Sequence, residues 1–221
     1  RTGFIAILGR PNVGKSTLLN AMLGEKIAIV SNKPQTTRTR ITGILTKGED
    51  QFVFLDTPGL IKAKNRLGDF MVRTVSDTIG EVDACIVVVE AGMKPGATDL
   101  AAIQRISAKK LPAILVINKT DRVGGEAVCR SILEYKDLYD FSAIVPTSAE
   151  NGRGVQDVID EASRLLHEGN WFFEADDITD QPERQIVSEI IREKALRLLR
   201  DEIPHGIAVE INSMKKRQDK N

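Results

Sequence analysis

Short apolar, β-branched runs alternate with amphipathic stretches over the first 168 residues of the chain. The apolar runs predict buried strands, and apolar residues that recur at helical spacing predict the helices between them. Such alternation is typical of a mostly parallel sheet with helices on both faces, so we expect an α/β fold. The predicted strands are 4–8, 52–56, 84–90, 113–118 and 142–146, and the predicted helices are 15–23, 67–79, 98–109, 126–135 and 155–167.

One pair of strands is expected to run antiparallel. Residues 40–46 and 51–54 are apolar stretches separated by the polar turn 47–50. Two such stretches around a short turn predict a β-hairpin. The sheet should therefore carry one antiparallel edge strand.

The pattern changes after residue 168. Residues 169–182 are acidic and aromatic and have no clear period, which indicates a linker. Beyond it, apolar residues from Ile186 to Leu199 recur at helical spacing, and the run 207–211 predicts a short strand. The predicted organisation is a first domain at 1–168, a linker at 169–182 and an incomplete α+β unit at 183–221.

Composition excludes several classes of protein. Among 221 residues, 42% are hydrophobic and 28% charged, which excludes a disordered, collagen-like or coiled-coil chain. Lys plus Arg and Asp plus Glu both number 31, so attraction to nucleic acid must come from a local patch. Two cysteines cannot build a disulfide scaffold, and no apolar run approaches the roughly 18 residues of a membrane span. We therefore expect the protein to work in a reducing compartment. Because the chain begins with Arg1 and not with Met, we also expect a few residues to precede it.

The most specific motif follows the first strand. Residues 9–16 form a glycine-containing loop before a predicted helix, and in this context glycines let successive backbone N–H groups turn toward a phosphate. Lys15 can reach the β- and γ-phosphates of a nucleotide, and the Ser16 hydroxyl can bind magnesium. The predicted phosphate-binding residues are Gly9, Arg10, Pro11, Asn12, Val13, Gly14, Lys15, Ser16 and Thr17.

Two strand-end segments favour guanine as the base. Asp121, in Asn118-Lys119-Thr120-Asp121, offers a carboxylate that can accept two N–H groups from guanine, a pair that adenine lacks. Asn118 would bond the base and brace the phosphate loop, while the Lys119 stem would cover the ring. In Ser148-Ala149-Glu150, the Ala149 backbone N–H can donate to guanine O6. Open α/β sheets bind ligands at this end of their strands.

Two further segments can sense the γ-phosphate. The segment Asp56-Thr57-Pro58-Gly59 ends a predicted strand, so that its carboxylate can hold magnesium through water and the Gly59 N–H can meet a γ-phosphate. The polar loop 31–38 should supply one more hydroxyl to the metal. We predict Thr37 for that position, with Thr36 as the alternative. The predicted magnesium set is Ser16, Thr37 and Asp56.

With these motifs in this order, the chain resembles the translation-factor-type GTPases, and from about Gly3 to Ile211 it is similar to the Era family of bacterial GTPases. Outside the nucleotide motifs, the resemblance is carried by residues 178–184, 189–194 and 202–210. It implies a protein that binds GTP and GDP with Mg²⁺, hydrolyses GTP, and acts in assembly of the small ribosomal subunit and in maturation of the 3′ end of its ribosomal RNA. It also implies a cytoplasmic location, with peripheral association at the inner face of the cell membrane left open.

The resemblance further implies that residues 183–221 are the first part of a type II KH domain, which would bind the 3′ end of the small-subunit ribosomal RNA. A KH domain clamps RNA with a Gly-x-x-Gly loop, whereas the only glycine after Gly169 is Gly206. We therefore expect this chain to lack the RNA clamp. Any RNA binding should be weak and should depend on the basic residues 215–217.

The expected hydrolysis is slow. Ras-like enzymes orient the attacking water with a Gln after the Asp-x-x-Gly segment, and Leu60 occupies that position here. The catalytic candidates are then Lys15, Thr37, Gly59 and Asn12. Asn12 is similar to the asparagine of potassium-stimulated relatives, which implies a K⁺ ion near the phosphates, although Asn12 could equally be a structural loop residue. The alternative function is a non-catalytic module that binds RNA or ribosomes for as long as GTP is bound.

Overall fold

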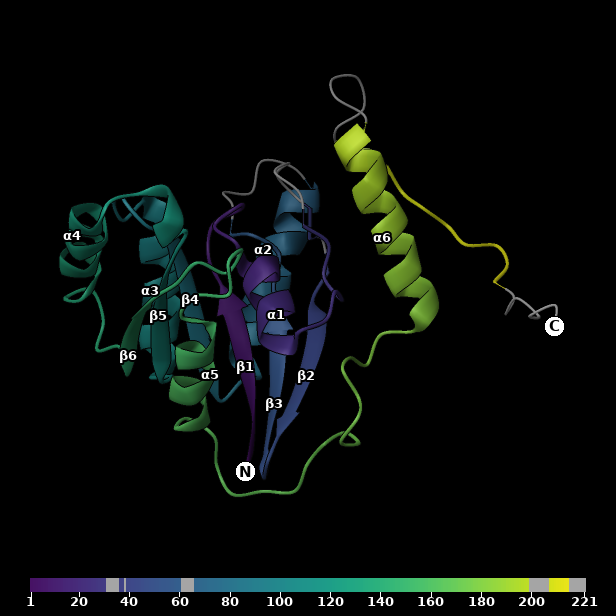
Figure 1. Ribbon diagram of the computed structural model, residues 1–221, viewed down its shortest axis with the longest axis horizontal. Coiled ribbons are helices and arrows are strands. Elements are labelled where there is room, and N and C mark those ends of the chain that lie inside the picture. Colours follow the sequence, from purple (N-terminus) through teal and green to yellow (C-terminus); the bar gives the residue numbers. More distant parts are fainter. Residues whose placement is uncertain (31–35, 38, 61–65, 199–206, 215–221) are drawn as a thin grey trace.

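The structure is a computed structural model that describes residues 1–30, 36, 37, 39–60, 66–198 and 207–214. The strands in this part of the chain are β1 Thr2–Leu8, β2 Ile41–Lys47, β3 Asp50–Asp56, β4 Ala84–Glu90, β5 Ala113–Asn118 and β6 Ala143–Pro146. They form one sheet in the order β2-β3-β1-β4-β5-β6 (Figure 1). Every pair is parallel except β2 with β3, so the predicted α/β class with one antiparallel edge strand is confirmed.

Helices cover both faces of this sheet. The helices are α1 Lys15–Leu23, α2 Arg66–Gly80, α3 Ala97–Lys109, α4 Gly125–Tyr135, α5 Val155–Ser163 and α6 Glu183–Leu198. Two apolar clusters result, one between the sheet and α1 and α5, the other between the sheet and α2, α3 and α4 (Figure 1). Along β1, Ile5 and Ile7 face the first cluster while Ala6 and Leu8 face the second, as the period of a strand requires. No helix within the described ranges is long and apolar enough to span a bilayer.

The helix predicted at 155–167 ends earlier, at Ser163. The residues that follow turn back toward the first strand, where His167 exchanges two backbone hydrogen bonds with Thr2, at 2.9 and 3.1 Å. Leu166 is buried against the first cluster. The helix therefore ends where the chain turns to pair with the start of β1, although the helical spacing of apolar residues continues beyond Ser163.

The short strand predicted at 207–211 is wrong, because these residues have no strand pairing. The segment runs back beside α6 (Figure 1), and the Ser188 hydroxyl donates to the Val209 carbonyl at 2.6 Å. A strand needs the edge of a sheet as its partner, and the element beside this segment in the described residues is a helix. Leu198, the last residue of α6, is 79% exposed.

The segment 169–182, predicted as a linker, is bonded to the β2–β3 hairpin along its length. The Gln51 side chain, fully buried, accepts from the Phe172 and Phe173 N–H groups at 2.8 and 3.1 Å and donates to the Phe173 carbonyl at 2.9 Å. Further on, the Ile178 carbonyl accepts the Ile44 N–H at 2.9 Å. The segment therefore covers the otherwise open edge of β2 and leads the chain to α6.

Candidate nucleotide-binding site

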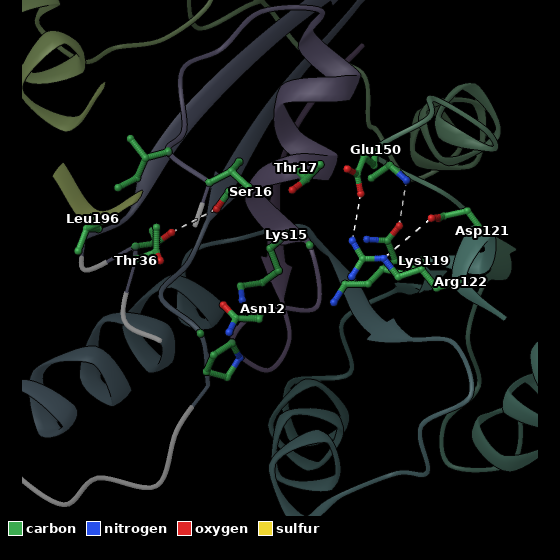
Figure 2. A pocket seen from close by; sticks show the side chains of 18 residues that line it. Asn12, Lys15, Ser16, Thr17, Thr36, Lys119, Asp121, Arg122, Glu150 and Leu196 are labelled. Atoms are coloured by element: carbon green, nitrogen blue, oxygen red, sulfur yellow. Dashed lines mark hydrogen bonds and ion pairs between the residues drawn. The ribbon is translucent and has the colours of Figure 1, made fainter. Parts of the chain in front are cut away.

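A pocket of about 610 Å³ lies where the loops after β1, β3, β5 and β6 converge (Figure 2). This is the end of an open α/β sheet at which ligands bind. Figure 2 shows Lys15 between two groups, with Thr36 and Leu196 on one side and Asp121 and Arg122 on the other. The lining residues are Pro11, Asn12, Gly14, Lys15, Ser16, Thr17, Ile29, Val30, Thr36, Thr37, Gly59, Asn118, Lys119, Asp121, Arg122, Ala149, Glu150 and Leu196.

The phosphate loop has a shape that requires its glycines. Gly14 has φ 102°, and a Cβ there would lie 2.2 Å from Asn118 Nδ2. A Cβ on Gly9 would lie 2.3 Å from the Val88 carbonyl oxygen. Asn12, at the tip of the loop, has φ 64° although it is not a glycine. The loop is thus pressed against β4 and β5, with its backbone curved toward the pocket.

Lys15 is buried beneath this loop and its Nζ donates to the carbonyl oxygens of Gly9 and Arg10, at 3.1 and 3.0 Å. Burial lowers the pKa of Lys15 to about 8, against a smaller opposing effect of Asp56. Neutral carbonyls offset the charge of an ammonium group only in part. An anionic phosphate at the loop would be a stronger partner for the same group.

Three oxygen-bearing side chains meet next to Lys15. The Ser16 hydroxyl donates to Asp56 Oδ2 at 2.5 Å and lies 3.2 Å from Thr37 Oγ1. Asp56 is fully buried, and burial raises its pKa to about 6, while Lys15 and the bond from Ser16 act in the opposite direction. Its second oxygen, Oδ1, is buried without a hydrogen-bond partner.

The donor set fits a magnesium ion that a nucleotide helps to coordinate. Mg²⁺ takes oxygen ligands and is usually held by one or two carboxylates together with water and phosphate. The buried, unsatisfied Asp56 Oδ1 supplies such an oxygen beside two hydroxyls. In the described part of the chain, no group of three or more His, Cys, Asp and Glu side chains is arranged so that it could hold a metal ion.

The other half of the pocket carries the side chains expected to read the base. Asn118 donates through Nδ2 to the Val13 carbonyl at 2.9 Å, which ties the strand end to the phosphate loop. Asp121 accepts from the Ser148 hydroxyl at 2.5 Å, and this bond holds the pKa of Asp121 below its ordinary value. Lys119 pairs with Glu90 at 2.8 Å. A carboxylate acceptor, an amide and an aliphatic stem therefore meet at one end of the pocket.

The Ala149 backbone N–H, expected to face guanine O6, instead donates to Asn118 Oδ1 at 3.0 Å. A guanine O6 would have to share or replace this bond. The loop after β6 is so close to Asn118 because the Thr147 hydroxyl also donates to that oxygen, at 3.2 Å. Ala149 lines the pocket all the same.

Seven predicted site residues are not among those that line the pocket. Val13 is buried in the first apolar cluster, Thr57 donates through its hydroxyl to the Ile7 carbonyl at 2.8 Å, and the Ser148 hydroxyl supports Asp121. Val13, Thr57 and Ser148 therefore support neighbouring residues, whereas Asp56 is bonded to the lining residue Ser16 and keeps one oxygen unsatisfied. The seven are Gly9, Arg10, Val13, Asp56, Thr57, Pro58 and Ser148.

Leu60, which stands at the glutamine position of Ras-like enzymes, points away from the pocket. Its side chain is 6% exposed and belongs to the second apolar cluster, and its N–H donates to the Gly9 carbonyl at 3.0 Å. Gly59 before it lines the pocket, and a Cβ there would lie 2.9 Å from Pro11. The chain therefore passes tightly beneath the phosphate loop at this point, which positions a backbone N–H and not a side chain.

Sequence reasoning missed the lining residues from outside the motifs, Ile29, Val30, Arg122 and Leu196. Arg122 pairs with Glu150 at 3.1 Å across the base end of the pocket. Leu196 comes from α6, more than 150 residues from the phosphate loop along the chain. No local pattern could have indicated Leu196, because its position depends on how α6 packs on the first domain.

Known proteins match both the sequence and this geometry. A family model described as a 50S ribosome-binding GTPase matches residues 4–119. The chain is 48% identical over 219 residues to the GTPase Era of Ruminiclostridium cellulolyticum, covering 99% of this chain and 74% of that protein. Two Era crystal structures superpose with a TM-score of 0.87 at 38% identity, over 92% of this chain and 70% of each of those chains. One is a variant from Aquifex aeolicus bound to GDP and AlF4⁻, and the other is a complex with MgGDPNP and nucleotides 1506–1542 of 16S ribosomal RNA.

Proposed function

Because the chain belongs to the Era family of GTPases and is a GTP-hydrolysing enzyme, we propose that the pocket binds GTP with Mg²⁺ and is the site of hydrolysis. The observation that carries this proposal is the meeting of Ser16, Thr37 and the unsatisfied Asp56 carboxylate beside the buried Lys15. Bound Mg²⁺ would bridge β- and γ-phosphate oxygens and offset their charge. The pocket is large enough in volume for a nucleotide.

In this proposal each motif has a separate task. Backbone N–H groups of the loop 9–16 hold the phosphates, and Lys15 exchanges its two carbonyl partners for phosphate oxygens. The Gly59 N–H meets the γ-phosphate. A water then attacks the γ-phosphorus in line with the leaving β-phosphate oxygen, which yields GDP and inorganic phosphate.

The base end selects guanine. Asp121 accepts two N–H groups of the base, Asn118 bonds the ring and Lys119 covers its face. The Ala149 N–H, which donates to Asn118 Oδ1, would share or exchange that bond for one to O6. The low pKa of Asp121 supports the first role, because it keeps this group an acceptor. Adenine would present an acceptor to the carboxylate and lose both bonds.

Intrinsic hydrolysis is slow in this proposal. Leu60 is buried, and Gly59, which has no side chain, is the residue of the segment 56–60 that lines the pocket, which supports a reaction that relies on charge and positioning. Asn12 lines the pocket at the loop tip, in a position suited to a K⁺ ion near the phosphates. A hydrolysis rate that is the same in potassium and in sodium salts would remove the K⁺ part of the proposal, and Asn12→Ala should abolish any potassium stimulation.

At the level of the cell, we propose that GTP hydrolysis serves as a timer in the cytoplasm, in assembly of the small ribosomal subunit and maturation of its ribosomal RNA 3′ end. Support comes from the Era complex with nucleotides 1506–1542 of 16S ribosomal RNA, which includes a chain similar to 92% of this one. We also propose the division into a GTPase domain at 1–168, a linker at 169–182 and the first part of a KH domain at 183–221.

The decisive experiment is a competition for the pocket among GTP, GDP, XTP and ATP, with a fluorescent GDP derivative as the probe. GTP and GDP should displace the probe at similar low concentrations, while XTP and ATP should need far higher ones. Omitting Mg²⁺ should weaken GTP more than GDP, because the γ-phosphate adds a metal contact. Equal displacement by ATP and GTP would overturn the assignment of the base end.

A further inference from the structure

Arg192 of α6 is buried against the loop that precedes β2. It is 3% exposed, its Nε donates to Glu189 Oε1 at 2.8 Å, and its Nη2 donates to both Glu189 Oε2 and the carbonyl oxygen of Thr36. Thr36 lines the nucleotide pocket and directly precedes Thr37. A side chain from beyond the linker thus holds the backbone next to the residue assigned to magnesium.

Two neighbours of Arg192 contact the same region. Glu193 is fully buried and pairs with Lys26 Nζ at 2.5 Å, where Lys26 stands just after α1. One helical turn after Arg192, Leu196 is 3% exposed and lines the pocket beside Thr36 (Figure 2). Helix α6 therefore contacts the connection between α1 and β2 at two points, Lys26 and Thr36.

Polar groups buried to this degree must be paired in a defined geometry, because an unpaired buried charge is costly. Besides Glu189, the Thr36 carbonyl is the acceptor that the buried Arg192 Nη2 reaches, and Nη1 is buried without a hydrogen-bond partner among the described residues. This hydrogen bond holds the Thr36 carbonyl toward α6 and so restrains the peptide between Thr36 and Thr37. The Thr37 side chain is then held where its Oγ1 lies 3.2 Å from Ser16 Oγ.

We propose that Arg192 is a positioning residue for GTP hydrolysis: by holding the Thr36 carbonyl, it keeps the Thr37 hydroxyl at the Ser16–Asp56 cluster where Mg²⁺ binds. This inference rests on the proposed function of the pocket. Arg192 should affect GTP more than GDP. Only GTP has a γ-phosphate that contacts the metal, and Thr37 is the residue proposed to bind the metal in that complex. The GDP complex depends mainly on the phosphate loop and the base end, which Arg192 does not touch.

The test variant is Arg192→Met, which keeps the apolar stem but cannot donate a hydrogen bond. The matched control is Lys194→Met, which removes a positive charge from an exposed position on the same helix. In excess Mg²⁺ we expect kcat of Arg192→Met to fall about tenfold, the effect of one charge-assisted hydrogen bond, and half-saturation by Mg²⁺ to move to higher concentration. GDP affinity should stay within about twofold of the parent, because the phosphate loop and the base end, which bind GDP directly, are unchanged in this variant. Arg192→Lys, which retains the positive charge and N–H donors on a single nitrogen, should recover part of kcat.

Two results would overturn the proposal. Parent values of kcat and of Mg²⁺ half-saturation in Arg192→Met would overturn the proposal. A lower melting temperature together with equal losses of GDP and GTP affinity would show a purely structural role and would also overturn it. Thr37→Ala separates this failure from failure of the site itself: if that variant hydrolyses GTP like the parent, the role of Thr37 is wrong whatever Arg192 does.

Discussion

The Arg10 guanidinium lies 3.1 Å from the Asp99 carboxylate, so an ion pair ties the phosphate loop to the first turn of α3. Asp99 is 1% exposed and also accepts the Gly96 N–H at 2.9 Å and the Tyr135 hydroxyl at 3.1 Å. The Arg10 carbonyl, on the other side of the same residue, accepts from Lys15. Arg10 therefore links α3, through the Asp99 carboxylate, to Lys15, through its own carbonyl oxygen.

Asp99→Asn should weaken both stability and nucleotide binding. Removing one partner leaves a largely buried cation, and we expect the free energy of unfolding to fall by about 2 kcal/mol, less than for a fully buried pair because the Arg10 side chain is 24% exposed. GTP and GDP affinities should fall together, since the loop serves both. Urea unfolding and probe displacement provide the two measurements. Tyr135→Phe, which keeps the ion pair, should lose only about 1 kcal/mol and leave both affinities unchanged. Unaltered stability in Asp99→Asn would contradict the structural role of the pair.

Leu60→Ala should affect folding and not the chemical step. Truncation of this buried side chain is expected to lower the free energy of unfolding by about 2–4 kcal/mol, through lost apolar contact and the cavity left behind. Basal kcat should stay within a few-fold of the parent at a temperature where the variant is folded. A large loss of kcat in folded protein would show that Leu60 acts on hydrolysis.

Binding of Mg²⁺ should weaken in acid in a way that depends on Asp56. Burial raises the pKa of this group to about 6, so it is a carboxylate above that pH and becomes a neutral acid below it. Protons then compete with the metal, and the Mg²⁺ concentration that half-saturates GTP hydrolysis should rise as pH falls below about 6. Because the nucleotide also titrates, Asp56→Asn measured in parallel is the reference. An identical pH profile in the two proteins would exclude Asp56 from the metal site.

Asp121→Asn should exchange guanine for xanthine. The amide can donate to the C2 oxygen of xanthine, where the carboxylate accepted from the guanine amine. XTP should then displace the probe nucleotide better than GTP does. Ser148→Ala serves as the control, because it removes the hydroxyl that holds Asp121 and should weaken GTP without inverting the preference. A variant that still prefers GTP would remove Asp121 as the base reader.

RNA binding by this chain should be weak and strongly dependent on salt. The net charge is zero, no Gly-x-x-Gly sequence follows Gly169, and the basic cluster 215–217 lies outside the described residues. Three cations on single-stranded RNA predict a slope of log Kobs against log salt of about −2. Titration of the 3′-terminal ribosomal RNA segment at several salt concentrations measures it, and replacing the three basic residues with Ala should remove most of the binding. Tight, sequence-selective binding would place the RNA site in the first domain or the linker.

Much of the fold could be predicted because its signals are local. Apolar runs, the hairpin turn at 47–50 and the glycines of the phosphate loop each determine the conformation of a few adjacent residues, so the strands of the sheet and its antiparallel pair could be located. The Era-family resemblance is likewise confirmed. The predicted roles of the site residues remain predictions, although the structure brings Lys15, Ser16, Thr37, Asp56 and Gly59 into one region.

What the sequence could not indicate depends on contacts between distant segments. Residue type could not distinguish Thr37 from Thr36, because both are threonines in one polar loop, whereas the 3.2 Å distance between Thr37 Oγ1 and Ser16 Oγ is a contact between distant segments. The end of α5 at Ser163 depends on pairing with Thr2, and the absence of a strand at 207–211 depends on what lies beside it. The burial of Arg192 likewise follows from packing across the linker.

The hydrogen bonds that fix the segment 169–182 to the β2–β3 hairpin have a consequence for how α6 stays docked. A short flexible tether would present the helix to the first domain at a millimolar effective concentration, to within about an order of magnitude. A tether held at Gln51 and Ile44 restricts the helix to a smaller volume, so its effective concentration is higher still. Little translational or rotational entropy is then left to lose on docking. The contacts of Arg192, Glu193 and Leu196 therefore have less entropy to offset than they would if α6 were a separate peptide.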